Sequence, residues 1–112
     1  MKPLSMPTIH IAPVGFEVDR IVEPAVSDKA DLVYLIMHHN ASDDKATKFA
    51  EKITLKLKKK RIKTKIVYAD RFDLFEIIRV IKEIIKDERD SQLLLNVASG
   101  SKIHAIACMM AC

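Results

Sequence analysis

The chain has 112 residues, of which 49% are hydrophobic and 30% charged, a composition that excludes disorder and fits one globular domain with a single core. The formal net charge is only +4, and glycines and aromatic residues are few, which argues against a turn-rich β-sandwich or barrel. The chain has two cysteines and lacks both a signal-peptide pattern and an apolar run of about 18 residues. We therefore expect a cytoplasmic protein with no membrane partner.

Apolar patterning predicts alternating strands and helices along the whole chain. The expected strands are residues 8–14, 31–38, 64–69 and 92–97. The expected helices are residues 16–27, 73–87 and 101–112, together with a helix that starts at residue 42 and ends among the lysines near residue 59. Ser42 and Asp73 are expected to cap the second and third helices. Pro24 lies inside the first helix, where it lacks an N–H group and is expected to kink the helix or end it early.

This order predicts a parallel sheet with helices on both faces, because the strands read as apolar on both sides and alternate with helices. Right-handed crossovers then give a doubly wound, three-layer α/β/α fold with the strand order 3-2-1-4. The order reverses between the first and fourth strands, and folds of this kind bind ligands there, outside the carboxyl ends of the strands. The turns at residues 13–17 and 96–102 are expected to meet at that point.

The second of these turns, Asn96-Val97-Ala98-Ser99-Gly100-Ser101-Lys102, has the composition of an anion site. Unpaired N–H groups at the start of the following helix, two hydroxyls and an ammonium group are donors suited to a phosphate. The spacing excludes a Walker loop, since no second glycine precedes Lys102 at the required distance. The first turn carries one glycine and the bulky Phe16, which argues against dinucleotide binding. Asn96 either contacts a ribose or ties down the neighbouring backbone.

The turn resembles the hallmark of the CRISPR-associated Rossmann-fold (CARF) domains, which lies at the end of their fourth strand. That hallmark runs from an asparagine and an aliphatic residue, through hydroxyl and small residues and a glycine, to a hydroxyl residue and a basic residue. Asn96, Val97, Gly100, Ser101 and Lys102 match it. Ala98 departs where a hydroxyl is usual, and Ser99 stands where glycine is common. The resemblance extends to the strand–helix order and to the first turn, residues 13–16.

The resemblance implies a single Rossmann-like domain over residues 1–112 that forms a homodimer and binds a cyclic oligoadenylate across the two-fold axis. It further implies a C-terminal effector beyond this sequence, a DNA-binding winged helix that regulates transcription in CRISPR defence. The end of the chain at Cys112, inside an apolar helix, fits such a truncation. The expected ligand-binding residues are Gly15, Phe16, His39, Asn96, Ser99, Gly100, Ser101 and Lys102. No metal, cofactor or catalytic residue is expected.

Two alternative functions stay open. One is a metal-independent ring nuclease, in which a ribose 2′-OH attacks the adjacent phosphate while Lys102 stabilises the developing charge. Ala98 and the lack of a general base argue against this activity. The other is a dimerisation module without a small ligand, built on the apolar helix over residues 101–112.

Several further residues have both a structural and a functional interpretation. Residues 38–40 form either an adenine or ribose contact or a polar loop, and Arg20 either reaches the anion site or lies in solvent. The basic run Lys56–Lys65 contains no aromatic residue, so a solvated helix end is favoured over a nucleic-acid contact. Packing is favoured over metal binding for three residues that share one face of the last helix, His104, Cys108 and Cys112.

Overall fold

The computed structural model describes residues 7–14, 18–38, 44–70 and 72–96 of the chain. The elements found there are β1 (Thr8–Pro13), α1 (Asp19–Ser27), β2 (Leu32–Met37), α2 (Asp44–Lys59), β3 (Lys63–Tyr68), α3 (Leu74–Asp87) and β4 (Gln92–Leu95). The predicted elements up to the fourth strand are thus confirmed, with ends that differ by a few residues. The predicted cap at Ser42 and the predicted helix over residues 101–112 lie outside the described residues.

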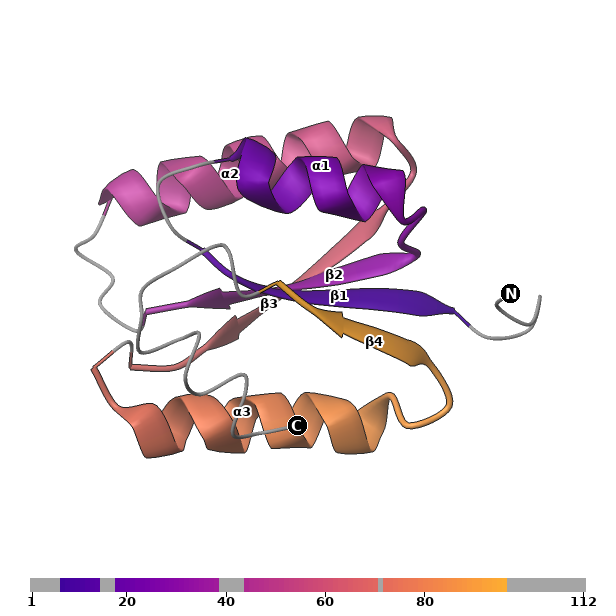
Figure 1. The fold of residues 1–112 in the computed structure, drawn as a ribbon. Coiled ribbons are helices and arrows are strands. Elements are labelled where there is room, and N and C mark those ends of the chain that lie inside the picture. Colours follow the sequence, from indigo (N-terminus) through magenta and orange to yellow (C-terminus); the bar gives the residue numbers. More distant parts are fainter. Residues whose placement is uncertain (1–6, 15–17, 39–43, 71, 97–112) are drawn as a thin grey trace.

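The four strands form one parallel sheet in the order β3-β2-β1-β4, which confirms the predicted topology. Figure 1 shows α1 and α2 over one face of this sheet and α3 over the other. The strand order reverses at β1, which pairs with β2 on one side and with β4 on the other. The chain therefore has the doubly wound, three-layer α/β arrangement of a Rossmann-like fold.

Each face of the sheet has its own apolar core, because successive side chains of a strand point to opposite faces. The cluster on the α3 side contains the buried residues Ile9, Ile11, Tyr34, Ile36, Ala69, Ile77, Val80, Ile81 and Ile84. The cluster on the side of α1 and α2 contains Ala12, Ile21, Val22, Ala25, Ala30, Val33, Leu35, Ile53, Leu57 and Ile62. The helical members recur at the spacing that predicted these helices.

Two polar residues are buried in β1, on the side of α1. Thr8 is 2% exposed and His10 is 3% exposed. The His10 Nε2 atom lies 3.0 Å from an Asp28 carboxylate oxygen, at the end of α1, and the Thr8 N–H group donates to an Asp31 carboxylate oxygen at 2.8 Å. The buried Nδ1 atom of His10 makes no hydrogen bond within the part of the chain that the structure describes. These contacts stabilise the amino end of the sheet.

The third polar contact at this end involves Tyr34, on the α3 side of β2. Its hydroxyl donates to the Glu88 carboxylate at 2.8 Å, just beyond the end of α3, and the Lys65 ammonium lies 5.6 Å from the centre of its ring. Burial and the hydrogen bond to Glu88 raise the pKa of Tyr34 to about 12. The phenol is therefore neutral in the folded protein at ordinary pH.

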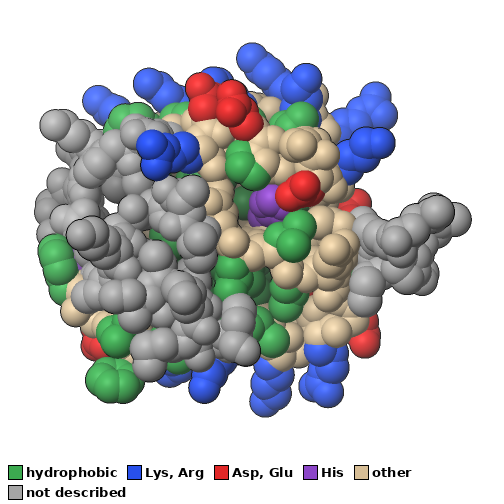
Figure 2. All heavy atoms as spheres, viewed as in Figure 1, with side chains coloured by type: hydrophobic (Ala, Val, Ile, Leu, Met, Phe, Trp, Pro, Cys, Tyr) green, Lys and Arg blue, Asp and Glu red, His purple; other side chains and the backbone are tan. Residues whose placement is uncertain are grey.

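The strand β3 departs from the prediction that all strands are buried on both sides. It forms one edge of the described sheet, and Lys63 and Lys65 are exposed along it. Charged side chains on an edge strand oppose pairing with a strand of another molecule. Figure 2 shows further Lys and Arg side chains along the upper and lower margins of the molecule, over the helices, with hydrophobic side chains between them.

Of the two outcomes expected at Pro24, a kink or an early end of the first helix, the early end is not found. The helix α1 continues through Pro24 to Ser27, and it begins at Asp19 rather than at residue 16. A proline inside a helix leaves the carbonyl four residues earlier without its usual N–H donor. In α1 that carbonyl belongs to Arg20, and another part of the chain supplies its donor.

Candidate functional site at the carboxyl end of the sheet

The ends of β1 and β4 lie side by side where the strand order reverses. Backbone pairing continues past both strands: the Val14 N–H group donates to the Ile36 carbonyl, and the Asn96 N–H group donates to the Ile11 carbonyl, each at 2.9 Å. Folds of this kind bind ligands outside the carboxyl ends of the strands, at this reversal. The two turns predicted to bind a ligand therefore start from adjacent points of the sheet.

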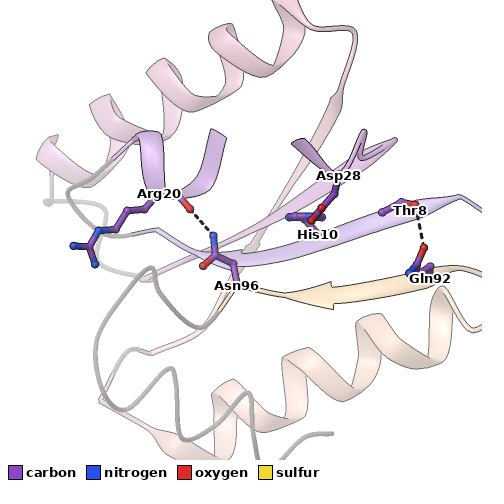
Figure 3. Close-up of polar contacts among 6 residues, drawn as sticks. All are labelled: Thr8, His10, Arg20, Asp28, Gln92 and Asn96. Atoms are coloured by element: carbon purple, nitrogen blue, oxygen red, sulfur yellow. Dashed lines mark hydrogen bonds and ion pairs between the residues drawn. The ribbon is translucent and has the colours of Figure 1, made fainter. Parts of the chain in front are cut away.

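Asn96 ties the end of β4 to the first helix. Its side-chain Nδ2 group donates to the Arg20 carbonyl at 2.6 Å (Figure 3). This carbonyl is the one that Pro24 leaves without an intrahelical donor, because a residue with an N–H group at position 24 would bond to it. The Asn96 amide thus supplies the hydrogen bond that α1 lacks at Arg20, although the two residues are 76 positions apart in sequence.

This contact bears on the two interpretations of Asn96. The amide nitrogen is bonded to the backbone of α1, which is the tying role, here directed to a helix rather than to the adjacent loop. The bond places the first residue of the turn 96–102 at a fixed position against α1. Pro24 and Asn96 were singled out separately in the sequence, and nothing in their spacing connects them.

The other predicted ligand-binding residues lie outside the described residues. They are Gly15, Phe16, His39, Ser99, Gly100, Ser101 and Lys102. Each follows a described strand end directly or within a few positions: Val14 precedes the first turn, His38 precedes His39, and Asn96 begins the turn after β4. Their contacts with a ligand stay predictions.

The carboxyl ends of β2 and β3 bring together His38, Asp70 and Phe72, of which only His38 was a candidate from the sequence. The His38 Nδ1 atom lies 3.7 Å from an Asp70 carboxylate oxygen, and its ring meets the Phe72 ring edge to face, with centroids 5.9 Å apart. The Ala69 N–H group donates to the Met37 carbonyl at 2.8 Å, which holds the two strand ends together. The sequence signal for this cluster was weak: an aspartate and a phenylalanine shortly after an edge strand.

The first turn of α1 contributes charged groups near this end of the sheet. The Lys56 ammonium of α2 lies 3.3 Å from an Asp19 carboxylate oxygen, in an exposed ion pair. Arg20 is also exposed, and Figure 3 shows its side chain extending away from Asn96. The Arg20 carbonyl accepts the Asn96 amide, and both interpretations of the Arg20 side chain stay open.

Metal binding has no support in the part of the chain that the structure describes, where no group of three or more His, Cys, Asp or Glu residues is arranged to hold an ion. His104, Cys108 and Cys112 lie outside that part. Among the helices described, none combines the length and the apolar character needed to cross a membrane.

Comparisons with known proteins agree with this architecture. The uncharacterized protein MJ1513 of Methanocaldococcus jannaschii is 43% identical over 104 residues, which cover 88% of this chain and 31% of that protein. Can2 from Sulfobacillus thermosulfidooxidans, solved in complex with cyclic tetra-adenylate, is similar with a TM-score of 0.75 over 93% of this chain and 28% of Can2, at 16% sequence identity. This second likeness shows a shared fold, and the chain spans about a third of the length of either protein. Residues 8–112 match the family model described as "HFX_2341_N:-like, N-terminal", and the chain belongs to that family.

Proposed function

We propose that this domain senses a cyclic oligoadenylate, or a related nucleotide, at the carboxyl ends of β1 and β4. The observation that carries the proposal is the bond from Asn96 to the Arg20 carbonyl, which fixes the start of the glycine- and serine-containing turn at the reversal of strand order. The fold shared with Can2, a protein solved with cyclic tetra-adenylate, supports the same ligand class. The CARF-like motif of the turn supports it independently.

The chemistry of the turn suits a ligand with several phosphates. The Gly100 and Ser101 N–H groups, the Ser99 hydroxyl and the Lys102 ammonium are donors for one phosphate, and charge-assisted bonds of this kind are the strong ones. Gly15, Phe16 and His39 belong to the neighbouring turns and contact the sugar or base in this proposal. The ring is bound and not cleaved, and the domain needs no cofactor.

In this proposal two copies of the domain form a homodimer, and each supplies one turn to a single ring. Ligand binding changes the relative position of effector domains elsewhere in the protein, and DNA contact belongs to such an effector, a winged helix that regulates transcription in the cytoplasm. The length of the relatives supports the presence of further domains, since the chain covers 31% of MJ1513 and 28% of Can2.

Calorimetry with cyclic tetra-adenylate tests the proposal directly. The wild type is expected to bind, and Lys102→Ala is expected to weaken binding about tenfold or more through loss of a charge-assisted hydrogen bond. Lys60→Ala is the matched control, because Lys60 is exposed just after α2, at the opposite end of the sheet. Absence of binding by the wild type, or equal affinity in Lys102→Ala, contradicts the proposed site. Chromatography of the recovered ligand is expected to show an intact ring.

A further inference from the structure

The cluster of His38, Asp70 and Phe72 lies at the same end of the sheet as the proposed phosphate-binding turn, residues 96–102, but apart from that turn. It follows β2 and β3, whereas the predicted anion turn follows β4. Phe72 is 72% exposed, although removing a phenylalanine ring from water is favourable in free energy. An exposed ring beside a carboxylate and an imidazole suggests a surface made for a ligand.

A tight turn fixes the position of the Phe72 ring. The Phe72 N–H group donates to an Asp70 carboxylate oxygen at 2.9 Å, and the Asp73 N–H group donates to the Asp70 carbonyl at 3.0 Å. Asp73 in turn caps α3, since its carboxylate accepts the Glu76 N–H group at 3.1 Å. The ring is thus held by backbone bonds and by the edge-to-face contact with His38, and little ordering is needed before a ligand binds.

The same turn leaves a hydrogen-bond acceptor beside the ring. The Asp70 side chain is 42% exposed, and a carboxylate has more acceptor positions than its contacts with His38 and the Phe72 N–H group occupy. A carboxylate accepts a hydrogen bond from an exocyclic amino group, such as the N6 amino group of adenine, and it repels the O6 oxygen of guanine or hypoxanthine. Every nucleobase can stack on an exposed aromatic ring, so the Phe72 ring contributes affinity for any base. The Asp70 carboxylate contributes the selectivity for adenine.

We propose that Phe72, Asp70 and His38 form an adenine subsite, in which the base stacks on Phe72 and donates its amino group to Asp70. The inference rests on the proposed function, since the adenine belongs to the ring whose phosphate occupies the turn after β4. The ends of β3 and β4 are three strand spacings apart, about 14 Å. A ring of several nucleotides with its bases turned outward spans this distance. His38 positions Asp70 and Phe72 through its contacts with both.

The test uses the full-length protein and a cyclic tetra-adenylate that carries 8-vinyladenine, a fluorescent base that keeps the N6 amino group, in place of one adenine. Stacking quenches the fluorescence of this base, so the wild type is expected to bind the ring and quench it. Phe72→Ala is expected to bind about fivefold more weakly or worse and to lose part of the quenching. Phe75→Ala is the matched control, because Phe75 is 78% exposed in the first turn of α3 and is expected to bind and quench like the wild type.

Base selectivity gives a second readout. The wild type is expected to prefer cyclic tetra-adenylate over cyclic tetra-inosinate by about fivefold or more, and Asp70→Asn to reduce this preference, since an amide also donates to O6. Unchanged affinity and quenching in Phe72→Ala, or equal losses in Phe72→Ala and Phe75→Ala, overturn the subsite while ring binding stands. Absence of ring binding by the wild type overturns the proposed function itself, and the subsite with it.

Discussion

The two ends of the parallel sheet use polar side chains in different ways. At the amino end, the buried His10 ring contacts the Asp28 carboxylate, which follows α1, and the buried Thr8 hydroxyl donates to the Gln92 amide oxygen. The Tyr34 hydroxyl donates to the Glu88 carboxylate, which follows α3. At the carboxyl end, the Phe72 side chain is 72% exposed and the Asp70 side chain 42% exposed, whereas His38 and Asn96 are partly buried. The Asn96 amide, which donates to the Arg20 carbonyl, makes a long-range bond at this end of the kind found at the amino end.

This difference separates residues that stabilise the fold from residues that remain available to a ligand. A buried polar group that is hydrogen-bonded contributes to stability, and its removal leaves its partner or a cavity behind. An exposed group contributes little to stability, so an exposed ring or carboxylate at the end of the sheet where folds of this kind bind ligands calls for a functional explanation. Substitutions at the amino end are therefore expected to change unfolding, and substitutions at the carboxyl end to change binding.

The largest expected effect is that of His10→Ala, at the amino end. The substitution removes a side chain that is 3% exposed, creates a cavity on the side of the sheet covered by α1 and α2, and removes the His10 contact of the Asp28 carboxylate. We expect the free energy of unfolding to fall by about 3 kcal/mol, measured by urea denaturation. Lys48→Ala, at an exposed position of α2, is a control with little expected effect. A stable His10→Ala protein that has lost ligand binding would reverse the roles assigned to the two ends.

A smaller effect is expected where Asn96 meets α1. Asn96→Ala removes the donor to the Arg20 carbonyl, and we expect a loss of about 1 kcal/mol in the free energy of unfolding. Pro24→Ala introduces an N–H group that can bond to the same carbonyl within the helix. The loss caused by Asn96→Ala is therefore expected to shrink in the Pro24→Ala background, and a double-mutant cycle by urea denaturation measures the coupling. Strictly additive effects would mean that the two residues act independently.

The smallest effect is expected from Tyr34→Phe and depends on pH. Burial and the bond to Glu88 raise the pKa of Tyr34 from 10.0 to about 12, so the unfolded phenol ionises at lower pH than the folded one. The contribution to stability is therefore complete below pH 10.0 and is lost as the pH rises toward about 12. Tyr34→Phe is expected to cost about 1 kcal/mol or less near neutral pH and to flatten this dependence in urea denaturation. Tyr68→Phe, at an exposed tyrosine, is the control and is expected to retain the wild-type dependence.

The topology could be predicted from the sequence because it depends on local patterns. Apolar strands alternating with amphipathic helices leave few ways to form a parallel sheet with right-handed crossovers. The spacing of Asp73 and Glu76 predicted the start of α3, because Asp73 caps the helix by accepting the Glu76 N–H group. The exposure of β3 was not predicted, because every strand was expected to be buried on both sides, although the predicted order 3-2-1-4 already placed this strand at an edge. The bond between Asn96 and Arg20 and the meeting of His38 with Asp70 and Phe72 depend on tertiary contacts that no periodicity encodes.

The continuation of α1 through Pro24 limits which amino-acid substitutions the protein can accept during evolution. One hydrogen bond joins the helix to the end of β4: α1 supplies the Arg20 carbonyl as the acceptor, and Asn96 supplies the amide donor that Pro24 lacks. A substitution that restores an N–H group at position 24 removes the need for an amide at position 96, and a substitution at position 96 makes the proline costly. The two positions are therefore expected to vary together among related sequences, and the residue that begins the proposed ligand-binding turn is constrained by a helix that follows a different strand.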